Sequence, residues 1–250
     1  MAVDGRTELI REIERLREEL ATREHEAADR ERQLQFYAKD LRETFKQERA
    51  RAQELHRSYM ATVRALSNAV EARDAYTGKH AERVTAYGLE VARVIGGPLM
   101  GIPQLEFGFL LHDVGKVAIP DAILYKPARL SDKERALMAQ HPVIGAQIVR
   151  GIEFLAQAAQ VVRHHHERWD GTGYPDGLAG EDIPLAARVF AVADVLDALT
   201  TDRPYRQASA LGVAREMINN ETGTHFDPGV IDAFNTVDDD TFLRIGAEIQ

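Results

Sequence analysis

The histidines of this chain are unevenly distributed. Six of the nine lie between positions 80 and 166, and three are consecutive in the stretch "VVRHHHERWDGTGYP", which begins at Val161. Neutral imidazoles bind divalent metals of the first transition row, and they also titrate near neutral pH. Taken alone, the stretch is compatible with a metal site, a pH sensor or a solvated run of surface residues.

Two carboxylates in apolar surroundings favour the metal site. Asp113 follows His112 in "LLHDVGK", and Asp194 lies in the apolar segment "VFAVADVLDAL". Burying such groups is costly unless they are paired or bind a metal. One buried histidine is usually satisfied by ordinary hydrogen bonds, but five imidazoles and two carboxylates suffice for two octahedral metals if one carboxylate bridges them. The candidate donors are His80, His112, Asp113, His141, His165, His166 and Asp194.

The donor set also indicates which metals and which chemistry to expect. The chain contains no cysteine, which excludes disulfides, zinc–thiolate sites and cysteine nucleophiles. A nitrogen and oxygen donor set suits iron or manganese better than zinc or magnesium. Two such ions about 3.5–4 Å apart activate a bridging water and hold a phosphoryl group. We therefore expect two divalent ions, Fe or Mn, at a site suited to phosphoester hydrolysis.

Composition restricts the partners and the location. The 250 residues carry a formal net charge of −9, which argues against a nucleic acid polymer as partner but leaves room for a small anionic ligand at a local positive patch. No apolar run approaches the length of a membrane span, and the N-terminus is charged from its fourth residue. We therefore expect no membrane segment and no signal peptide. The sequence predicts a cytoplasmic protein.

The elements that must position these residues begin with a long helix. Residues 6–57 hold 26 charged residues, 13 of each sign, and neither proline nor glycine. Apolar residues recur every seven positions from Ile13 to Leu41 and again at Leu55. Such a row is typical of a coiled coil, and an isolated helix of this length has little to stabilise it. We predict a parallel dimeric coiled coil over residues 1–60; a solvated single helix is the alternative, because arginines interrupt the companion row.

The remaining residues, 61–250, have the pattern of a mainly helical domain. Short helical patterns are separated by glycine and proline, as in "GGPLMGIP" and "DGTGYPDGLAGEDIP", and few segments alternate with the period of a strand. The predicted fold class is all-α. No linker separates the two parts, so the coiled coil is expected to continue into the first helix of the domain. Because no sensory fold is encoded, we expect input from an upstream sensory domain or a partner protein.

Four motifs follow one another in the order expected of a known family. They are "HD" at 112–113, "HPVIG" from 141, "HHERWDGTGYP" from 165 and "ADVLDALTTDRPYR" from 193. Over roughly residues 62–245 the chain resembles the HD-GYP family of cyclic di-GMP phosphodiesterases. The resemblance implies an HD-domain helical bundle and metal-dependent hydrolysis of cyclic di-GMP to linear pGpG, with some members continuing to GMP.

The resemblance also implies how the donors are divided. One metal would be held by His80, His112, Asp113 and Asp194, and the second by Asp113, His141, His165 and His166. Asp113 would therefore bridge the two ions. In this alignment His164 is a bystander, because the family motif begins at the last two histidines before Glu167.

Further residues would act on the substrate. The resemblance implies that Lys116 neutralises the phosphate or protonates the leaving oxygen, and that Tyr174, Arg203 and Arg206 contact the dinucleotide. Asp197 matches a position at the edge of the site, where it would support the metals or the ligand. The simpler alternatives are a tyrosine that packs on a surface turn and arginines in surface salt bridges.

The residue at position 76 bears on the number of metals. Some family members carry a glutamate four residues before the first histidine and bind a third metal, whereas this chain has Tyr76 there, so we predict two metals.

The leading functional prediction is an active phosphodiesterase that is a homodimer regulated through its coiled coil. The alternatives are a catalytically weak sensor of cyclic dinucleotides or protein-interaction module, and a phosphodiesterase for another cyclic dinucleotide.

Overall fold

The structure, a computed structural model, describes residues 2–73, 79–99, 105–202 and 206–249. Across these ranges the chain is helical, with one isolated bridge between Thr222 and Phe226 and no strand, so the predicted all-α class is confirmed. No helix in these ranges is long and apolar enough to cross a membrane.

The α-helices are α1 (Ala2–Glu71), α2 (His80–Ile95), α3 (Leu105–Leu110), α4 (Asp121–Leu124), α5 (Asp132–Met138), α6 (His141–Arg150), α7 (Ala158–His164), α8 (Leu185–Thr200), α9 (Leu211–Asn220), α10 (Pro228–Thr236) and α11 (Asp239–Glu248). Short 3₁₀ helices are η1 (Gly97–Leu99), η2 (Val114–Ala118), η3 (Glu153–Leu155) and η4 (Gly180–Asp182).

The chain divides into two compact units, Met1–Tyr59 and Met60–Gln250, and the boundary falls inside α1. In the first unit the heptad row is open to solvent: Leu20, Leu34 and Leu41 are 57%, 69% and 71% exposed. Exposed ion pairs one turn apart, such as Arg15 with Glu12 and Arg23 with Glu19, support the helix. An exposed row of this kind gains stability when a second helix covers it, and the parallel dimer stays a prediction.

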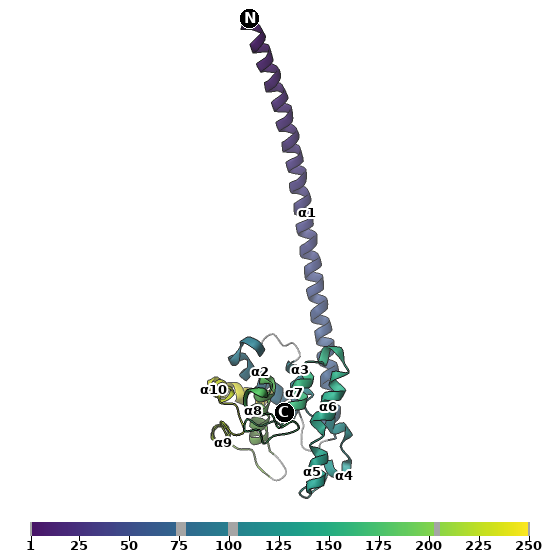
Figure 1. The fold of residues 1–250 in the computed structure, drawn as a ribbon, viewed down its shortest axis with the longest axis vertical. Helices are drawn as coiled ribbons and strands as arrows, with labels where there is room; N and C mark the ends of the chain where they lie inside the picture. Colours follow the sequence, from purple (N-terminus) through teal and green to yellow (C-terminus); the bar gives the residue numbers. More distant parts are fainter. Residues whose placement is uncertain (1, 74–78, 100–104, 203–205, 250) are drawn as a thin grey trace. The chain divides into compact units, whose positions relative to one another are not determined.

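The second unit, which we call the catalytic unit, is built around α8. Helix α8 is apolar on almost every side, and it packs against α2, α7, α9 and α10 (Figure 1). The rings of Phe109, Phe190 and Phe234 are fully buried in this core. Each buried aromatic ring contributes about 2–3 kcal/mol to stability. Against this apolar background α8 carries two carboxylates, Asp194 and Asp197.

A glycine brings two segments of the catalytic unit into unusually close contact. A Cβ atom on Gly115 in η2 would lie 1.9 Å from the carbonyl oxygen of His141 and 2.6 Å from the backbone nitrogen of Gly145. No side chain fits there, so only glycine permits the approach. The contact packs η2 against α6 and thereby brings Asp113, the residue before η2, beside His141 at the start of α6.

Candidate metal centre

The predicted metal donors all come from the ends of helices or from α8. His80 begins α2, and His141 begins α6. His112 and Asp113 occupy the turn between α3 and η2, His165 and His166 follow the last residue of α7, and Asp194 lies in α8. Helix ends let short side chains from separate segments converge, because the backbone changes direction at those points.

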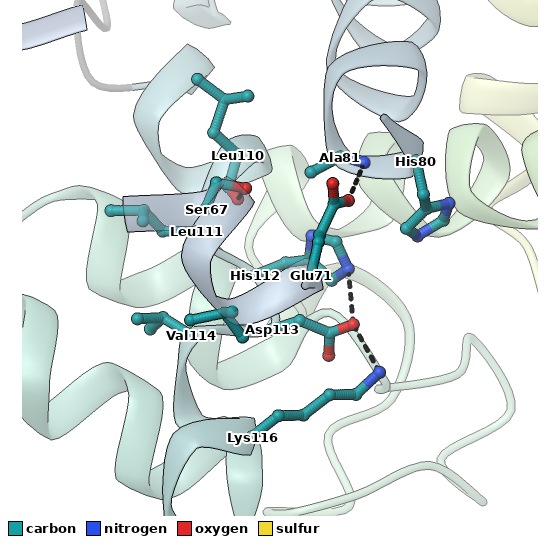
Figure 2. Close-up of a pocket in the computed structure, with 11 residues that line it drawn as sticks. Ser67, Glu71, His80, Ala81, Leu110, Leu111, His112, Asp113, Val114 and Lys116 are labelled. Carbon is teal, nitrogen blue, oxygen red and sulfur yellow. Dashed lines mark hydrogen bonds and ion pairs between the residues drawn. The ribbon is translucent and has the colours of Figure 1, made fainter. Parts of the chain in front are cut away.

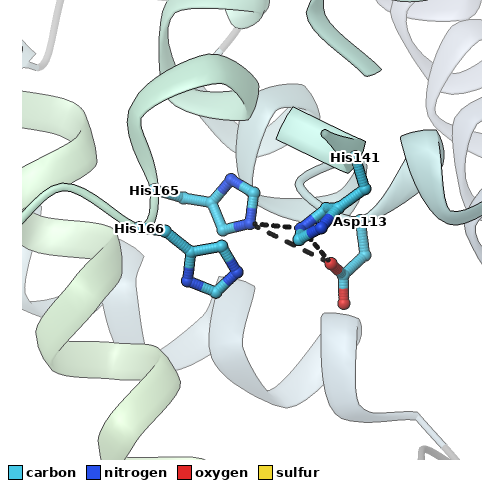
Figure 3. A group of neighbouring side chains, drawn as sticks. All are labelled: Asp113, His141, His165 and His166. Atoms are coloured by element: carbon cyan, nitrogen blue, oxygen red, sulfur yellow. Dashed lines mark hydrogen bonds and ion pairs between the residues drawn. The ribbon is translucent and has the colours of Figure 1, made fainter. Parts of the chain in front are cut away.

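Asp113 lies at the middle of the arrangement. Its Oδ1 atom is 3.1 Å from Nε2 of His141 and 3.9 Å from Nε2 of His165. Its other oxygen, Oδ2, is 3.1 Å from Nε2 of His112. Potential ligand atoms of Asp113, His141, His165 and His166 all lie within 4.8 Å of one another (Figure 3). One carboxylate therefore contacts histidines on both of its sides, as a bridging ligand must.

Backbone carbonyls fix how three of the imidazoles are turned. Nδ1 of His112 lies 2.9 Å from the carbonyl oxygen of Phe109. In the same way, Nδ1 of His141 lies 2.8 Å from the carbonyl oxygen of Met138, and Nδ1 of His165 lies 2.8 Å from that of Val162. A carbonyl oxygen only accepts hydrogen bonds, so the Nδ1 atom of each ring carries the proton and, in the neutral ring, Nε2 presents a lone pair.

These lone pairs converge, which is the test of whether the site fits a metal. Nε2 of His141 and Nε2 of His165 are 3.2 Å apart, and each ring already donates from Nδ1 to a carbonyl. Two neutral rings in this arrangement bring lone pairs together with no proton between them, whereas a divalent cation would accept both. The residues therefore fit the divalent ions implied by the sequence, with His141, His165, His166 and Asp113 as one set of donors.

Burial favours the neutral ring in two of these imidazoles. It lowers the pKa of His165 well below the usual range, and it lowers the pKa of His166 to about 4, with the nearby His141 adding to the effect. For Asp113, burial alone would favour the neutral acid, but the charge of Lys116 and the contact with His112 hold its pKa well below the ordinary value. His165, His166 and Asp113 are thus in the protonation states that metal binding requires.

The donors around His80 are arranged differently. Nε2 of His80 lies 3.3 Å from Oδ1 of Asp194, while its Nδ1 lies 2.7 Å from Oδ2 of Asp197. Burial lowers the pKa of His80, but the hydrogen bonds to these two carboxylates outweigh it and raise the pKa to about 10. The same contact with His80 overcomes burial and lowers the pKa of Asp194 to about 2. In the metal-free protein this part of the site is an imidazolium between two carboxylates.

The predicted catalytic lysine contacts the bridging carboxylate. Nζ of Lys116 lies 2.8 Å from Oδ2 of Asp113 (Figure 2). Lys116 lines a small pocket with His80, His112 and Asp113. Its ammonium group is thus placed where a phosphate that contacts the donors would meet it.

Tyr174 lies beside the metal donors. Its ring centroid is 4.7 Å from that of His166, with the planes inclined by 30°. Burial raises the pKa of Tyr174 to about 12, with the charge of Asp113 adding to the shift, so the hydroxyl keeps its proton. The turn before it requires glycine, because a Cβ on Gly173 would lie 2.4 Å from the backbone nitrogen of Arg168. The tyrosine therefore faces the site as a neutral hydrogen-bond donor.

Four of the remaining predicted positions have different outcomes. Arg203 and Tyr76 lie outside the described residues. Arg206 is exposed, and its Nη2 atom donates to the carbonyl oxygen of Ala198, at the end of α8. The ring nitrogens of His164 contact Gln160 and Asp176 rather than the donor cluster.

Asp197 lies behind His80 and is buried, with 1% of its surface exposed. Besides its contact with His80, it accepts from Nε of Arg83 at 2.6 Å and from Nη2 of the same residue at 3.1 Å. Of the two roles inferred from sequence, support of a metal ligand agrees with this position, because a carboxylate on Nδ1 orients an imidazole and increases its basicity.

Sequence reasoning missed three supporting residues. Arg83 pairs with Asp197. The sequence feature that could have pointed to Arg83 is its position one turn after His80 on the same helix.

Glu167 accepts from the backbone nitrogens of Asp176 and Leu178 at 2.8 and 3.1 Å and so holds the loop that carries Tyr174. Glu71 accepts from the backbone nitrogen of Ala81, next to His80, at 2.6 Å. No spacing rule points to Glu71, because that contact joins two separate helices, α1 and α2.

These features agree with the comparison to known families. The HD domain family model matches residues 64–230, well over half of the chain. The chain therefore belongs to the HD domain family. This match and the similarity to curated cyclic di-GMP phosphodiesterases confirm the resemblance to HD-GYP proteins.

Two curated relatives illustrate the family. The cyclic di-GMP phosphodiesterase response regulator RpfG of Xanthomonas campestris is 42% identical over 174 residues, which cover 69% of this chain and 46% of the relative. The 3'3'-cGAMP-specific phosphodiesterase 2 of Vibrio cholerae is 40% identical over 195 residues, which cover 77% of this chain and 35% of the relative. The chain thus spans less than half the length of either relative.

A solved structure supports the fold. The HD domain of the phosphodiesterase PgpH from L. monocytogenes, in complex with cyclic-di-AMP, matches with a TM-score of 0.52 and 16% identity, covering 74% of this chain and 96% of that chain. At this identity the likeness concerns the fold alone, and it agrees with the all-α HD-domain bundle described above.

Proposed function

We propose that this chain is a metal-dependent phosphodiesterase that hydrolyses cyclic di-GMP to linear pGpG. The observation that carries the proposal is the pair of converging Nε2 lone pairs of His141 and His165 beside a carboxylate that also contacts His112. Relatives named as cyclic di-GMP phosphodiesterases support the choice of substrate. When bound, two divalent ions, Fe or Mn, supply an activated water and neutralise phosphate charge.

The side chains of the site have separate roles in the proposed reaction. Asp113, held ionised by Lys116 and His112, joins the two sets of donors. Lys116 supplies a positive charge for the phosphate or a proton for the leaving oxygen. Tyr174 offers a neutral hydroxyl to the dinucleotide, and Arg203 and Arg206 are assigned to its phosphates or guanine edges, since the guanidinium group suits both.

Incubation of the purified chain with Mn²⁺ or Fe²⁺ and cyclic di-GMP, followed by chromatography of pGpG and GMP, tests the proposal. Asp113→Ala is expected to abolish cleavage, whereas Asp182→Ala, at an exposed position away from the donors, leaves the rate unchanged. Accumulation of pGpG supports a reaction that stops after the first bond. A wild-type chain that binds metal but forms no product contradicts the proposal and favours the sensor.

A second substrate is supported by one comparison. The Vibrio cholerae relative named for 3'3'-cGAMP is about as similar to this chain as the relative named for cyclic di-GMP. Both dinucleotides present the same phosphodiester to the metals, so the base contacts decide between them. Side-by-side measurement of kcat/KM on the two substrates tests the choice, and a higher value on 3'3'-cGAMP reassigns the substrate.

We further propose that residues 1–60 form a parallel dimeric coiled coil that receives the regulatory signal, from an upstream domain or a partner protein, in the cytoplasm. The exposed heptad row supports this. Leu34→Glu places a charge in that row and is expected to give a monomer by light scattering. Gln53→Glu adds the same charge off the row and is the control. A monomeric wild-type chain contradicts the dimer.

A further inference from the structure

The helix that carries the first predicted metal ligand lacks a cap of its own. Helix α2 begins at His80, and the residue before it, Lys79, has a left-handed backbone with φ 57° and makes no side-chain capping bond. The first backbone N–H groups of any helix have no partner within the helix. An external acceptor is therefore needed next to a residue whose position decides the metal site.

Glu71 supplies that acceptor from another helix. It is the last residue of α1, and its Oε1 atom accepts from the backbone nitrogen of Ala81 at 2.6 Å (Figure 2). A carboxylate at a helix N-terminus satisfies an unpaired donor and interacts favourably with the helix dipole. Both residues belong to the catalytic unit. The backbone nitrogen of Ala81, next to His80, is thus held by a side chain from ten positions earlier in the sequence.

Glu71 also faces the donors themselves. It lines one pocket together with His80, His112, Asp113 and Lys116 (Figure 2). Burial raises the pKa of its carboxyl, and the N–H of Ala81 partly opposes this shift. A partly buried carboxyl group is costly unless it is hydrogen-bonded, and Glu71 makes such a bond with the start of α2.

The turn of α1 before Glu71 is anchored next to the same site. Oγ of Ser67 donates to the carbonyl oxygen of Leu110 at 2.7 Å, two residues before His112. After the helix, Arg73 donates to the carbonyl oxygen of Val117 at 2.8 Å, just beyond Lys116. These contacts hold the end of α1 against the segment that carries both His112 and Asp113.

We infer that Glu71 is a positioning residue that caps α2 and thereby fixes His80 at the metal site. Asp197 orients the ring of His80 from Nδ1, and Glu71 fixes the backbone from which that ring extends. This inference rests on the proposed function. Because α1 also carries the heptad row, a displacement of its last turn would reach the backbone next to His80 through this hydrogen bond.

Two substitutions distinguish capping of α2 by Glu71 from a direct role of its charge at the metal site and from no role there. Glu71→Ala removes the acceptor, whereas Glu71→Gln keeps an oxygen that accepts from Ala81 and removes only the charge. Glu54→Ala, an exposed glutamate on the same helix, is the matched control. Each variant is measured in the full chain, with a thermal melt to establish that the domain is folded.

The first readout is independent of the metal. In metal-free protein, hydrogen exchange at the start of α2, including the Ala81 amide, is expected to be about fivefold faster or more in Glu71→Ala and close to wild type in Glu71→Gln. The second readout is Mn²⁺ affinity with kcat and KM for cyclic di-GMP. Glu71→Ala is expected to lower metal affinity and kcat by about tenfold or more with little change in KM, and Glu71→Gln to restore most of both.

Three outcomes overturn the inference. Equal losses in both variants would make the charge itself essential, as for a direct metal ligand. Wild-type affinity and kcat in Glu71→Ala would remove any role at the site. Unchanged exchange at Ala81 would show that the cap is not formed. Failure of the proposed function is distinct, because there the wild-type chain itself would bind no metal or cleave nothing.

Discussion

The two halves of the candidate metal centre are built from similar residues in opposite electrostatic states. We call His80, His112 and Asp194 the first half, and His141, His165 and His166 the second half; Asp113 lies between them. Burial lowers the pKa of His80, but its hydrogen bonds to Asp194 in the first half and to Asp197 behind it raise that pKa to about 10. In the second half burial, with the nearby His141 adding to the effect, lowers the pKa of His166 to about 4. The ring of His166 is therefore ready for a cation, whereas the ring of His80 must lose a proton to bind one.

The largest effect is expected where the halves meet. Asp113→Asn removes the charge that contacts donors on both sides, so both ions are expected to bind weakly and cleavage of cyclic di-GMP to fall by about 100- to 1,000-fold. Metal content by mass spectrometry and product analysis check this. Retention of full activity would mean that Asp113 does not join the halves. Asp182→Asn is the control, since that side chain is exposed.

A pH dependence should separate the halves. Because the pKa of His80 is about 10, its ring is protonated near pH 7.5, and an ion entering the first half must displace about one proton. Affinity there should rise about tenfold per pH unit as pH approaches 10. The ring of His166, with a pKa of about 4, is already neutral and releases none. Calorimetric Mn²⁺ titrations in buffers of different ionisation enthalpy measure this; equal proton release at both sites would remove the distinction.

The carboxylate behind the first half should matter for stability as well. Asp197→Asn leaves the buried guanidinium of Arg83 beside a neutral partner. Breaking a buried ion pair from one side costs about 3 kcal/mol, and loss of the charge next to His80 should lower its pKa. Urea unfolding measures the first effect, and reduced proton release on Mn²⁺ binding measures the second. A variant as stable as the wild type would show that this pair contributes little.

The smallest effect is expected at the edge of the second half. Tyr174→Phe keeps the ring against His166 and removes only the hydroxyl. If that group donates to the dinucleotide, KM should rise about fivefold, as for the loss of one hydrogen bond, while kcat and metal content stay near wild type. Steady-state kinetics decide this. A fall in kcat without a change in KM would instead assign Tyr174 to the reaction itself.

The sequence was sufficient to propose the metal donors, because several histidines and carboxylates in apolar surroundings are costly to bury unless they are paired or bind a metal. His112 with Asp113, His165 with His166, and Asp194 in an apolar helix each carry a local signal, and the order of the motifs identified the family. Periodicity and composition also predicted the all-α class and the start of the helical domain. These features depend on near neighbours in the chain, which a sequence displays directly.

Only the tertiary structure decided which groups support the donors and how they are charged. Arg83 reaches Asp197 across 114 positions, and Ser67 reaches Leu110 across 43, so neither contact follows from spacing. The contrast between His80 and His166 likewise depends on which charges each ring meets after burial. The sequence by itself indicated which side chains are the candidate metal donors, because ligand chemistry belongs to residue types. The fold determined their protonation and their positioning, since both depend on distances that exist only once the helices are packed.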